Sequence, residues 1–120
     1  MLPLNNASKE GSKEVAGMVA EVSAANADVL LLTGDVTSEN VASLRDKGES
    51  IIRQMTSQGT VDLAGLCSAN TITLSLLLSW LRFAKRSNVS LVISQSPGKL
   101  FDMARVSGLE LILPFESMNS

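Results

Sequence analysis

The polar side chains best suited to chemistry stand in one short stretch, between an apolar run and a strongly apolar helical segment. They are the thiol of Cys67, the hydroxyls of Ser68, Thr71 and Thr73, and the amide of Asn70. A hydroxyl at the start of a helix lies beside unpaired backbone N–H groups and the positive end of the helix dipole. The stretch is therefore either a functional site or a simple helix cap by Asn70 or Thr71, and the spacing favours the cap.

Several kinds of chemistry are excluded by composition. The chain has no histidine, so it lacks the imidazole base of the common serine and cysteine hydrolases and the commonest metal ligand. Cys67 is the only cysteine, which excludes an internal disulfide or zinc cluster and favours an intracellular protein with a buried thiol. The aspartates do not have the spacing of a carboxylate metal loop; they are Asp28, Asp35, Asp46, Asp62 and Asp102. We expect no metal, no cofactor and no catalysis.

Nucleotides and nucleic acids are not expected ligands either. The stretch Pro97-Gly98-Lys99-Leu100 contains the Gly-Lys pair of a phosphate-binding loop, but it lacks the earlier glycine and the following Ser or Thr. Lys and Arg number 10 and Asp and Glu number 12, which gives a net charge of −2. Such a balance provides no broad electrostatic surface for a polyphosphate backbone.

The length and hydropathy fit one folded domain. The chain has 120 residues, of which 45% are hydrophobic and 18% charged, against about 25% charged in an average globular protein. We expect the domain over residues 15–114, a flexible N-terminal tail over 1–14 and a C-terminal tail over 115–120. The opening residues lack the pattern of a secretory signal. Residues 63–81 are uncharged and long enough to cross a bilayer, but Gly65, Ser68 and Asn70 divide them into a strand, a loop and a helix.

Strands and helices alternate along the chain. Apolar runs predict strands at 17–24, 29–33, 60–66, 89–93 and 109–113. Helical periodicity predicts a helix from about 41 to 55, capped by Thr37 or Ser38 and stopped by Gly59, and a second helix over 71–86. A third, short helix follows Ser96 as cap, with Pro97 at its first position and Gly108 after its end. This order predicts an α/β fold with a mixed, mostly parallel sheet, the first strand antiparallel to the second, and about three flanking helices.

The sequence resembles the STAS domain family. The resemblance lies in Leu32-Thr33-Gly34-Asp35-Val36, in Val61-Asp62-Leu63 leading through Asn70-Thr71 into Leu76-Leu77-Leu78, in Val89-Ser90-Leu91-Val92-Ile93 and in Gly108-Leu109. The stretch from Leu76 to Arg86 is most similar to the MlaB-like group. The resemblance implies a noncatalytic cytoplasmic subunit, peripheral to the inner membrane, that binds the ATPase (MlaF-like) of a phospholipid-transport ABC complex with permease and substrate-binding subunits. It also implies a role in outer-membrane lipid asymmetry.

The same family contains anti-sigma factor antagonists, which supply an alternative function. In those proteins the matching junction usually carries Asp-Ser-Ser-Gly or Asp-Ser-Gly, with one serine phosphorylated by a partner kinase. This chain has Asn70-Thr71-Ile72-Thr73, so Thr71 retains a hydroxyl at the phosphorylatable position while the aspartate and the glycine are replaced. In the MlaB-like group the same position is commonly threonine, and the resemblance implies that it lies at the surface that docks on the ATPase.

The helix predicted over 71–86 has more apolar surface than one sheet covers. At 100° per residue its apolar arc spans about 240°, whereas packing on a sheet needs somewhat more than ~100°. If Leu77 and Leu81 face the sheet, the surplus forms a flank of Ile72, Leu76 and Phe83 beside Thr71, with Trp80 at its boundary. We therefore expect a partner to contact Asn70, Thr71, Ile72, Thr73, Leu76, Trp80 and Phe83. A neighbouring helix of the same domain covering this flank is the alternative.

Overall fold

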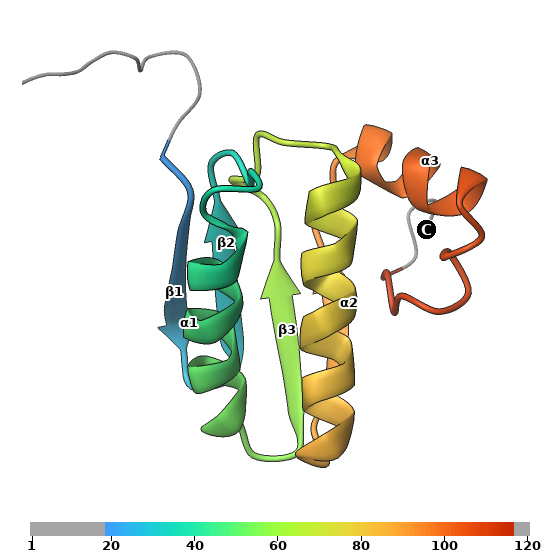
Figure 1. The fold of residues 1–120 in the computed structure, drawn as a ribbon. Coiled ribbons are helices and arrows are strands. Elements are labelled where there is room, and N and C mark those ends of the chain that lie inside the picture. Colours follow the sequence, from blue (N-terminus) through green and yellow to red (C-terminus); the bar gives the residue numbers. More distant parts are fainter. Residues whose placement is uncertain (1–18, 117–120) are drawn as a thin grey trace, which may run out of the picture.

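One mixed four-stranded sheet lies at the centre of the computed structural model, which describes residues 19–116 (Figure 1). Its strands are β1 (Glu21–Asn26), β2 (Val29–Thr33), β3 (Gln58–Asp62) and β4 (Ser90–Ser94), in the spatial order β1-β2-β3-β4. β1 is antiparallel to β2, and β2, β3 and β4 are parallel to one another. The predicted α/β class, the mixed sheet and the antiparallel first pair are confirmed.

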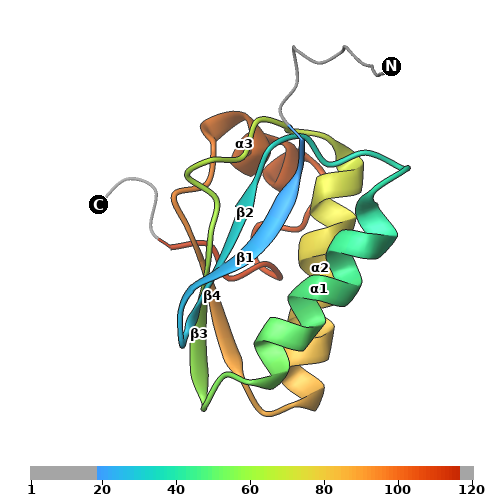
Figure 2. The same ribbon diagram turned by 90° about the vertical axis from the view of Figure 1, so that its left-hand side faces the viewer.

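Three helices complete this fold: α1 (Val41–Arg53), α2 (Thr71–Arg86) and α3 (Gly98–Val106). Figure 2 shows α1 and α2 side by side on one face of the sheet, with α3 near the end of the sheet where α2 begins. Their apolar faces enclose a core with side chains from β2, β3 and β4, because alternate strand residues point to the helices; these include Leu30, Leu32, Val61, Leu91 and Ile93. No helix within residues 19–116 is long and apolar enough to cross a membrane.

The two long helices approach each other through a glycine and a tryptophan. Trp80 of α2 is fully buried, and its indole N–H donates a hydrogen bond of 3.2 Å to the carbonyl oxygen of Arg45 in α1. A Cβ atom placed on Gly48 would lie 2.2 Å from the indole ring, so only glycine leaves room for the ring. The predicted position of Trp80 at the boundary of an exposed flank is therefore wrong, and the neighbouring helix α1 covers it.

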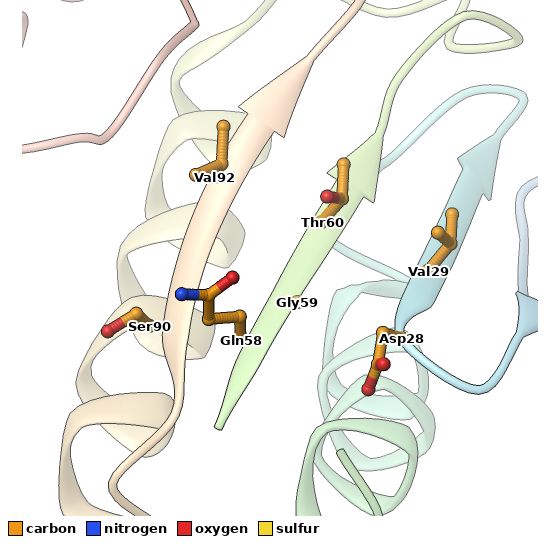
Figure 3. Close-up of a pocket in the computed structure, with 7 residues that line it drawn as sticks. All are labelled: Asp28, Val29, Gln58, Gly59, Thr60, Ser90 and Val92. Carbon is orange, nitrogen blue, oxygen red and sulfur yellow. The ribbon is translucent and has the colours of Figure 1, made fainter. Parts of the chain in front are cut away.

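The opposite face of the sheet is not covered by α1 or α2. Val29, Thr60 and Val92 stand in one row across β2, β3 and β4, and Val92 is 37% exposed. They border a hollow of about 380 Å3, shown in Figure 3. Its remaining lining comes from the starts of the same strands, at Asp28, Gln58, Gly59 and Ser90.

The strand predicted at 89–93 is β4, shifted by one residue to Ser90–Ser94, and two other predicted strands have clearly different bounds. The first is β1, which begins at Glu21 and extends to Asn26, rather than spanning 17–24. The third ends at Asp62 rather than at residue 66, because the Asp62 carboxylate accepts the N–H of Ala64 at 2.9 Å. The N–H of Leu66 then bonds to the carbonyl of Leu63 at 3.0 Å, and this turn ends the ladder.

The predicted ends of the first helix are also corrected. The residue at its N-cap is Asn40 rather than Thr37 or Ser38, and α1 ends at Arg53. The Asn40 side chain accepts the N–H of Thr37 at 2.9 Å, so it orders the preceding turn. Gly59 does not stop the helix but lies within β3. A Cβ there would meet the sulfur of the flexible Met55 side chain, so Met55 packs into the space that a larger residue would need.

The C-terminal part of the domain differs most from expectation. α3 starts at Gly98 with Pro97 as its N-cap residue, whereas Ser96 was the predicted cap; the Ser96 hydroxyl instead donates to the carbonyl of Pro97 at 3.2 Å. Gly108 follows the helix with a φ of +76°, as a terminating glycine does.

The predicted last strand over 109–113 is absent. The N–H of Leu113 bonds to the carbonyl of Leu109 at 2.9 Å, which closes a helix-like turn and leaves Leu111 93% exposed. Contact with the sheet comes later, where the N–H of Ile93 donates to Pro114 and that of Glu116 donates to Ile93, both at 2.8 Å. The predicted N-terminal tail, 1–14, and residues 117–120 lie outside the described residues.

Candidate functional site

Two loops meet at the carboxyl ends of β2 and β3. The first leads from Gly34 to Asn40 and the second from Leu63 to Asn70. Gly34 joins them through its backbone, since its N–H donates to Gly65 at 3.0 Å and its carbonyl accepts from Cys67 at 2.8 Å. Its φ of +83° favours glycine. The two loops therefore form one backbone unit beside the start of α2.

A set of four residues, called the polar ring below, joins the same loops through side chains. The N–H of Val36 donates to the Ser68 hydroxyl at 3.0 Å, and that hydroxyl lies 3.0 Å from the hydroxyl of Thr73. The Thr73 hydroxyl donates to Oδ1 of Asn70 at 3.0 Å. The Asn70 side-chain NH2 in turn donates to the carbonyl oxygen of Val36 at 3.1 Å, which closes the ring. Because Ser68 accepts from Val36 and Thr73 donates to Asn70, the Ser68 hydroxyl donates to Thr73.

The polar ring caps α2. Oδ1 of Asn70 also accepts the N–H of Thr73 at 2.8 Å, so of the two predicted caps, Asn70 and Thr71, the structure has Asn70. Ser68 and Thr73 are buried, with Thr73 fully enclosed. The expectation that Thr73 lies on the surface and contacts a partner is therefore wrong; its hydroxyl satisfies buried polar groups inside the domain.

Thr71 stands outside the polar ring. It is the first residue of α2 and is exposed, while the neighbouring Ile72 and Asn70 are half-buried. The N–H groups of Thr71 and Ile72 precede the first intrahelical hydrogen bonds of α2. The structure thus presents one hydroxyl, two backbone donors and part of an isoleucine at a firmly held helix start.

The predicted apolar flank of α2 is largely inside the domain. Leu76 is 1% exposed, and Ile72 and Phe83 are half-buried and pack against the core. The alternative interpretation, in which a neighbouring helix covers the flank, therefore fits α2 better. Ile72 and Phe83 retain some exposed surface, at opposite ends of the helix.

Strongly exposed apolar side chains lie elsewhere, at Val19 before β1, at the end of α3 and in the turn after it. Val106 is 85% exposed, and Leu111 and Ile112 are 93% and 54% exposed. Val106 borders a hollow of about 290 Å3 on α3, which is also lined by Lys99, Asp102, Met103 and Ser107. The sequence did not predict this exposed group, because Leu111 and Ile112 fall in the strand expected over 109–113.

The one cysteine is also placed differently from the prediction. Cys67 is exposed, and its thiol lies 3.8 Å from the carbonyl oxygen of Gly65. Within the described residues, no three His, Cys, Asp or Glu side chains gather as they would around a metal ion.

Comparison with known proteins gives one family model and several solved structures that match most of the chain. A family model described as Mlab, STAS domain, matches residues 19–114. Among curated proteins, no significant match to the chain was found. A solved structure of the anti-sigma factor antagonist SpoIIAA in its unphosphorylated form has a TM-score of 0.62 at 13% identity and covers 83% of this chain and 90% of its own.

Two further solved structures share the fold. An anti-sigma factor antagonist from Mycobacterium paratuberculosis has a TM-score of 0.66 at 11% identity, covering 84% of this chain and 86% of its own. An anti-sigma-factor antagonist (STAS) domain protein from Planctomyces limnophilus has a TM-score of 0.60 at 12% identity, covering 83% and 91%. At these identities the similarity shows the fold.

Proposed function

Because this chain belongs to the MlaB-like STAS domain family, we propose that it is a noncatalytic subunit that binds the ATPase of a phospholipid-transport ABC complex. The complex would include permease and substrate-binding subunits and maintain outer-membrane lipid asymmetry, with this subunit at the cytoplasmic face of the inner membrane. The single observation that best supports the proposal is the exposed Thr71 at the helix start that the polar ring holds.

The proposed docking surface is smaller than the surface expected from sequence. It consists of Thr71, the exposed part of Ile72 and the edge of Asn70. Thr73, Leu76 and Trp80 are buried, so they are not part of this surface. Phe83 lies 12 residues after Thr71 in α2, or about 18 Å along the helix, so it belongs to a different part of the surface.

Such a subunit needs no chemistry of its own. A protein that binds one conformation of an ATPase more tightly than another shifts the ATPase toward that conformation. A rigid docking surface favours this effect, because little conformational freedom is lost when a prearranged surface is bound. The polar ring provides that rigidity by fixing both loops and the first turn of α2.

The test is a pull-down of the ATPase from its native membrane complex by wild type, Thr71→Glu and Ser50→Glu. Ser50 is exposed on α1, so its variant introduces the same charge away from the docking surface. The proposal expects Thr71→Glu to lose the ATPase and Ser50→Glu to retain it. Equal retention by both variants, with both folded, would exclude Thr71 from the interface. Leu76→Asp is unsuitable because Leu76 is 1% exposed, and a buried charge would test folding.

A second candidate function is supported by the neighbours of known structure, since those above are named as anti-sigma factor antagonists. The exposed hydroxyl of Thr71 is accessible to a kinase, and a phosphate there would add a charge of about −1.5 to −2 and disrupt an apolar contact. Incubation with a serine kinase encoded nearby, followed by mass spectrometry, tests this candidate. Phosphate on Thr71, together with binding of an anti-sigma factor by the unphosphorylated chain, would favour it over the transport role.

A further inference from the structure

The charges of the domain are divided between its two layers. Helices α1 and α2 contain six basic residues, Arg45, Lys47, Arg53, Arg82, Lys85 and Arg86, and only two acidic ones, Asp46 and Glu49. The other described residues contain two basic residues, Lys99 and Arg105, and eight acidic ones. The helical layer therefore has a formal charge of +4 and the rest of the described domain −6, although the whole chain has only −2.

Three of the arginines surround one hollow between the two helices, called the α1–α2 groove below. Arg45 comes from α1 and Arg82 and Arg86 from α2, and the hollow has a volume of about 410 Å3. Asp46, Glu49 and Ser79 complete its lining. Arg82 and Arg86 are four residues apart, so they lie on one helix face about 6 Å from each other along the axis.

The helices that form the α1–α2 groove are held in a fixed relation. Trp80 fills the space between them, its indole N–H bonds to the carbonyl of Arg45 at 3.2 Å, and Gly48 allows the close approach. The backbone positions of Arg45 on α1 and of Arg82 and Arg86 on α2 are therefore fixed relative to one another. Bidentate arginine–carboxylate contacts depend on that geometry as well as on charge.

The three arginines of the groove exceed its two carboxylates by one, and close ion pairs among them are few within residues 19–116. Arg45 lies 3.9 Å from Asp46, with both side chains substantially exposed, and such surface pairs are weak. No carboxylate of the described residues lies within 4.0 Å of Arg82 or Arg86. The guanidinium groups of Arg86 and Arg53 instead both lie over the ring of Phe83, at 5.7 and 5.2 Å from its centre. Two positive charges are therefore close together at this end of the helices.

We propose that the α1–α2 groove binds an acidic helical segment of a partner protein, with carboxylates at positions i and i+4 that meet Arg82 and Arg86. Carboxylates one helical turn apart match the arginine spacing, and the partner would be recognised by charge, since the groove is lined by charged and polar residues alone. A membrane surface fits less well. Within residues 19–116 the exposed large apolar side chains all lie off α1 and α2, so this face has no apolar side chains to insert between lipids, as membrane-surface helices do. The proposal is independent of the Thr71 docking surface.

The test uses two fluorescein-labelled, alanine-based helical peptides of equal length and charge. One has its glutamates at i, i+4 spacing on a single face, and the other has them on opposite faces. Fluorescence anisotropy is measured with wild type, with a triple variant (Arg45→Glu, Arg82→Glu, Arg86→Glu), and with a control variant (Lys99→Glu, Arg105→Glu). The control residues are exposed basic side chains of α3, so the same type of change is made away from the groove.

We expect wild type to prefer the single-face peptide, the triple variant to lose at least about tenfold in affinity, and the control to stay within about twofold. Raising the ionic strength from about 0.05 to about 0.5 M should weaken binding, because exposed charges are screened. Circular dichroism, together with a neutral Arg→Gln triple variant, separates loss of binding from loss of fold. Equal affinity for both peptides, or an equal loss in the control, would overturn the proposal. So would cosedimentation with phosphatidylglycerol vesicles without peptide binding, or salt-dependent self-association in place of it.

Discussion

The hydroxyl oxygens of Ser68 and Thr73 lie 3.0 Å apart inside the domain, one in the loop after β3 and the other in the first turn of α2. Ser68 also accepts the N–H of Val36 at 3.0 Å, so this contact joins the loop after β2 to the start of the helix. The position of Thr71, between the two hydroxyl residues, follows from it. A change inside the polar ring should therefore affect both stability and the docking surface.

Ser68→Ala is expected to destabilise the domain by about 1–3 kcal/mol, because it leaves the buried N–H of Val36 without its acceptor. Chemical unfolding in urea measures this change. Ser75→Ala is the control, since Ser75 is exposed on α2. A cost for Ser68→Ala no larger than that of the control would contradict the buried hydrogen bond.

Thr73→Val should be coupled to Ser68→Ala, because the two side chains share one hydrogen bond. Once either hydroxyl is removed, removing the other should cost less than it does in wild type, by about 0.5 kcal/mol or more. The same urea experiment on the double variant measures the difference. Additive costs would mean that the two hydroxyls act separately.

Because Leu76 is buried, replacing it by alanine should destabilise the domain much more than the same change at an exposed leucine. Leu76 is 1% exposed and Leu111 is 93% exposed. Leu76→Ala should cost about 2–5 kcal/mol by removing core packing, whereas Leu111→Ala should change the free energy of unfolding by no more than about 0.5 kcal/mol. Thermal unfolding of both variants compares them. Similar melting temperatures for the two would show that Leu76 is not a core residue.

The exposure of Cys67 predicts that a thiol reagent modifies it in the folded protein. Its contact with the Gly65 carbonyl, at 3.8 Å, is too weak to protect the thiol. The rate of reaction with an aromatic disulfide should be within about tenfold of the rate in denaturant, since access and thiolate character control it. If Cys67 reacted only after unfolding, its thiol would be buried, as expected from the sequence.

Local signals were enough for part of the fold and of the site. The helix over 71–86 was predicted correctly, and Asn70 was one of its two predicted caps, because caps and periodicity involve residues a few positions apart. The polar ring was not predicted, since it needs Val36, which is 34 positions from Asn70 in the chain. The prediction of a strand over 109–113 was also wrong because local residue type was not sufficient. Its apolar residues suit a strand, but the bond from Leu113 to Leu109 forms a turn.

Tertiary packing also determines which element covers the excess apolar surface of α2. The wide apolar arc was read correctly from residues such as Leu76 and Trp80, both of which are buried. What covers part of it is α1, and the decisive residue there is Gly48, whose missing side chain leaves room for the indole ring. A glycine within a helical pattern has several possible structural reasons. Close packing against Trp80 can be recognised as the reason for Gly48 only when the position of α2 is known. The clustering of arginines from α1 and α2 depends on the same packing.

Gly48→Ala provides the sharpest test of this packing, because intrinsic preference and tertiary contact predict opposite signs. In an exposed helix, replacing glycine by alanine stabilises by about 1 kcal/mol, but here the new Cβ would lie 2.2 Å from the buried indole of Trp80. Overpacking costs about 1–3 kcal/mol, so we expect a net loss of stability in urea, with a change in the fluorescence of Trp80, the one tryptophan of the chain.

Gly98→Ala is the matched control for this variant, since Gly98 is the first residue of α3 and a Cβ there meets nothing within 4 Å. It should leave stability unchanged or raise it slightly. Combining Gly48→Ala with Trp80→Phe shrinks the ring that the new methyl group meets, so the alanine should cost less in that background than in wild type. A stabilising Gly48→Ala, or an equal cost in both backgrounds, would show that the two helices are not held together through this contact.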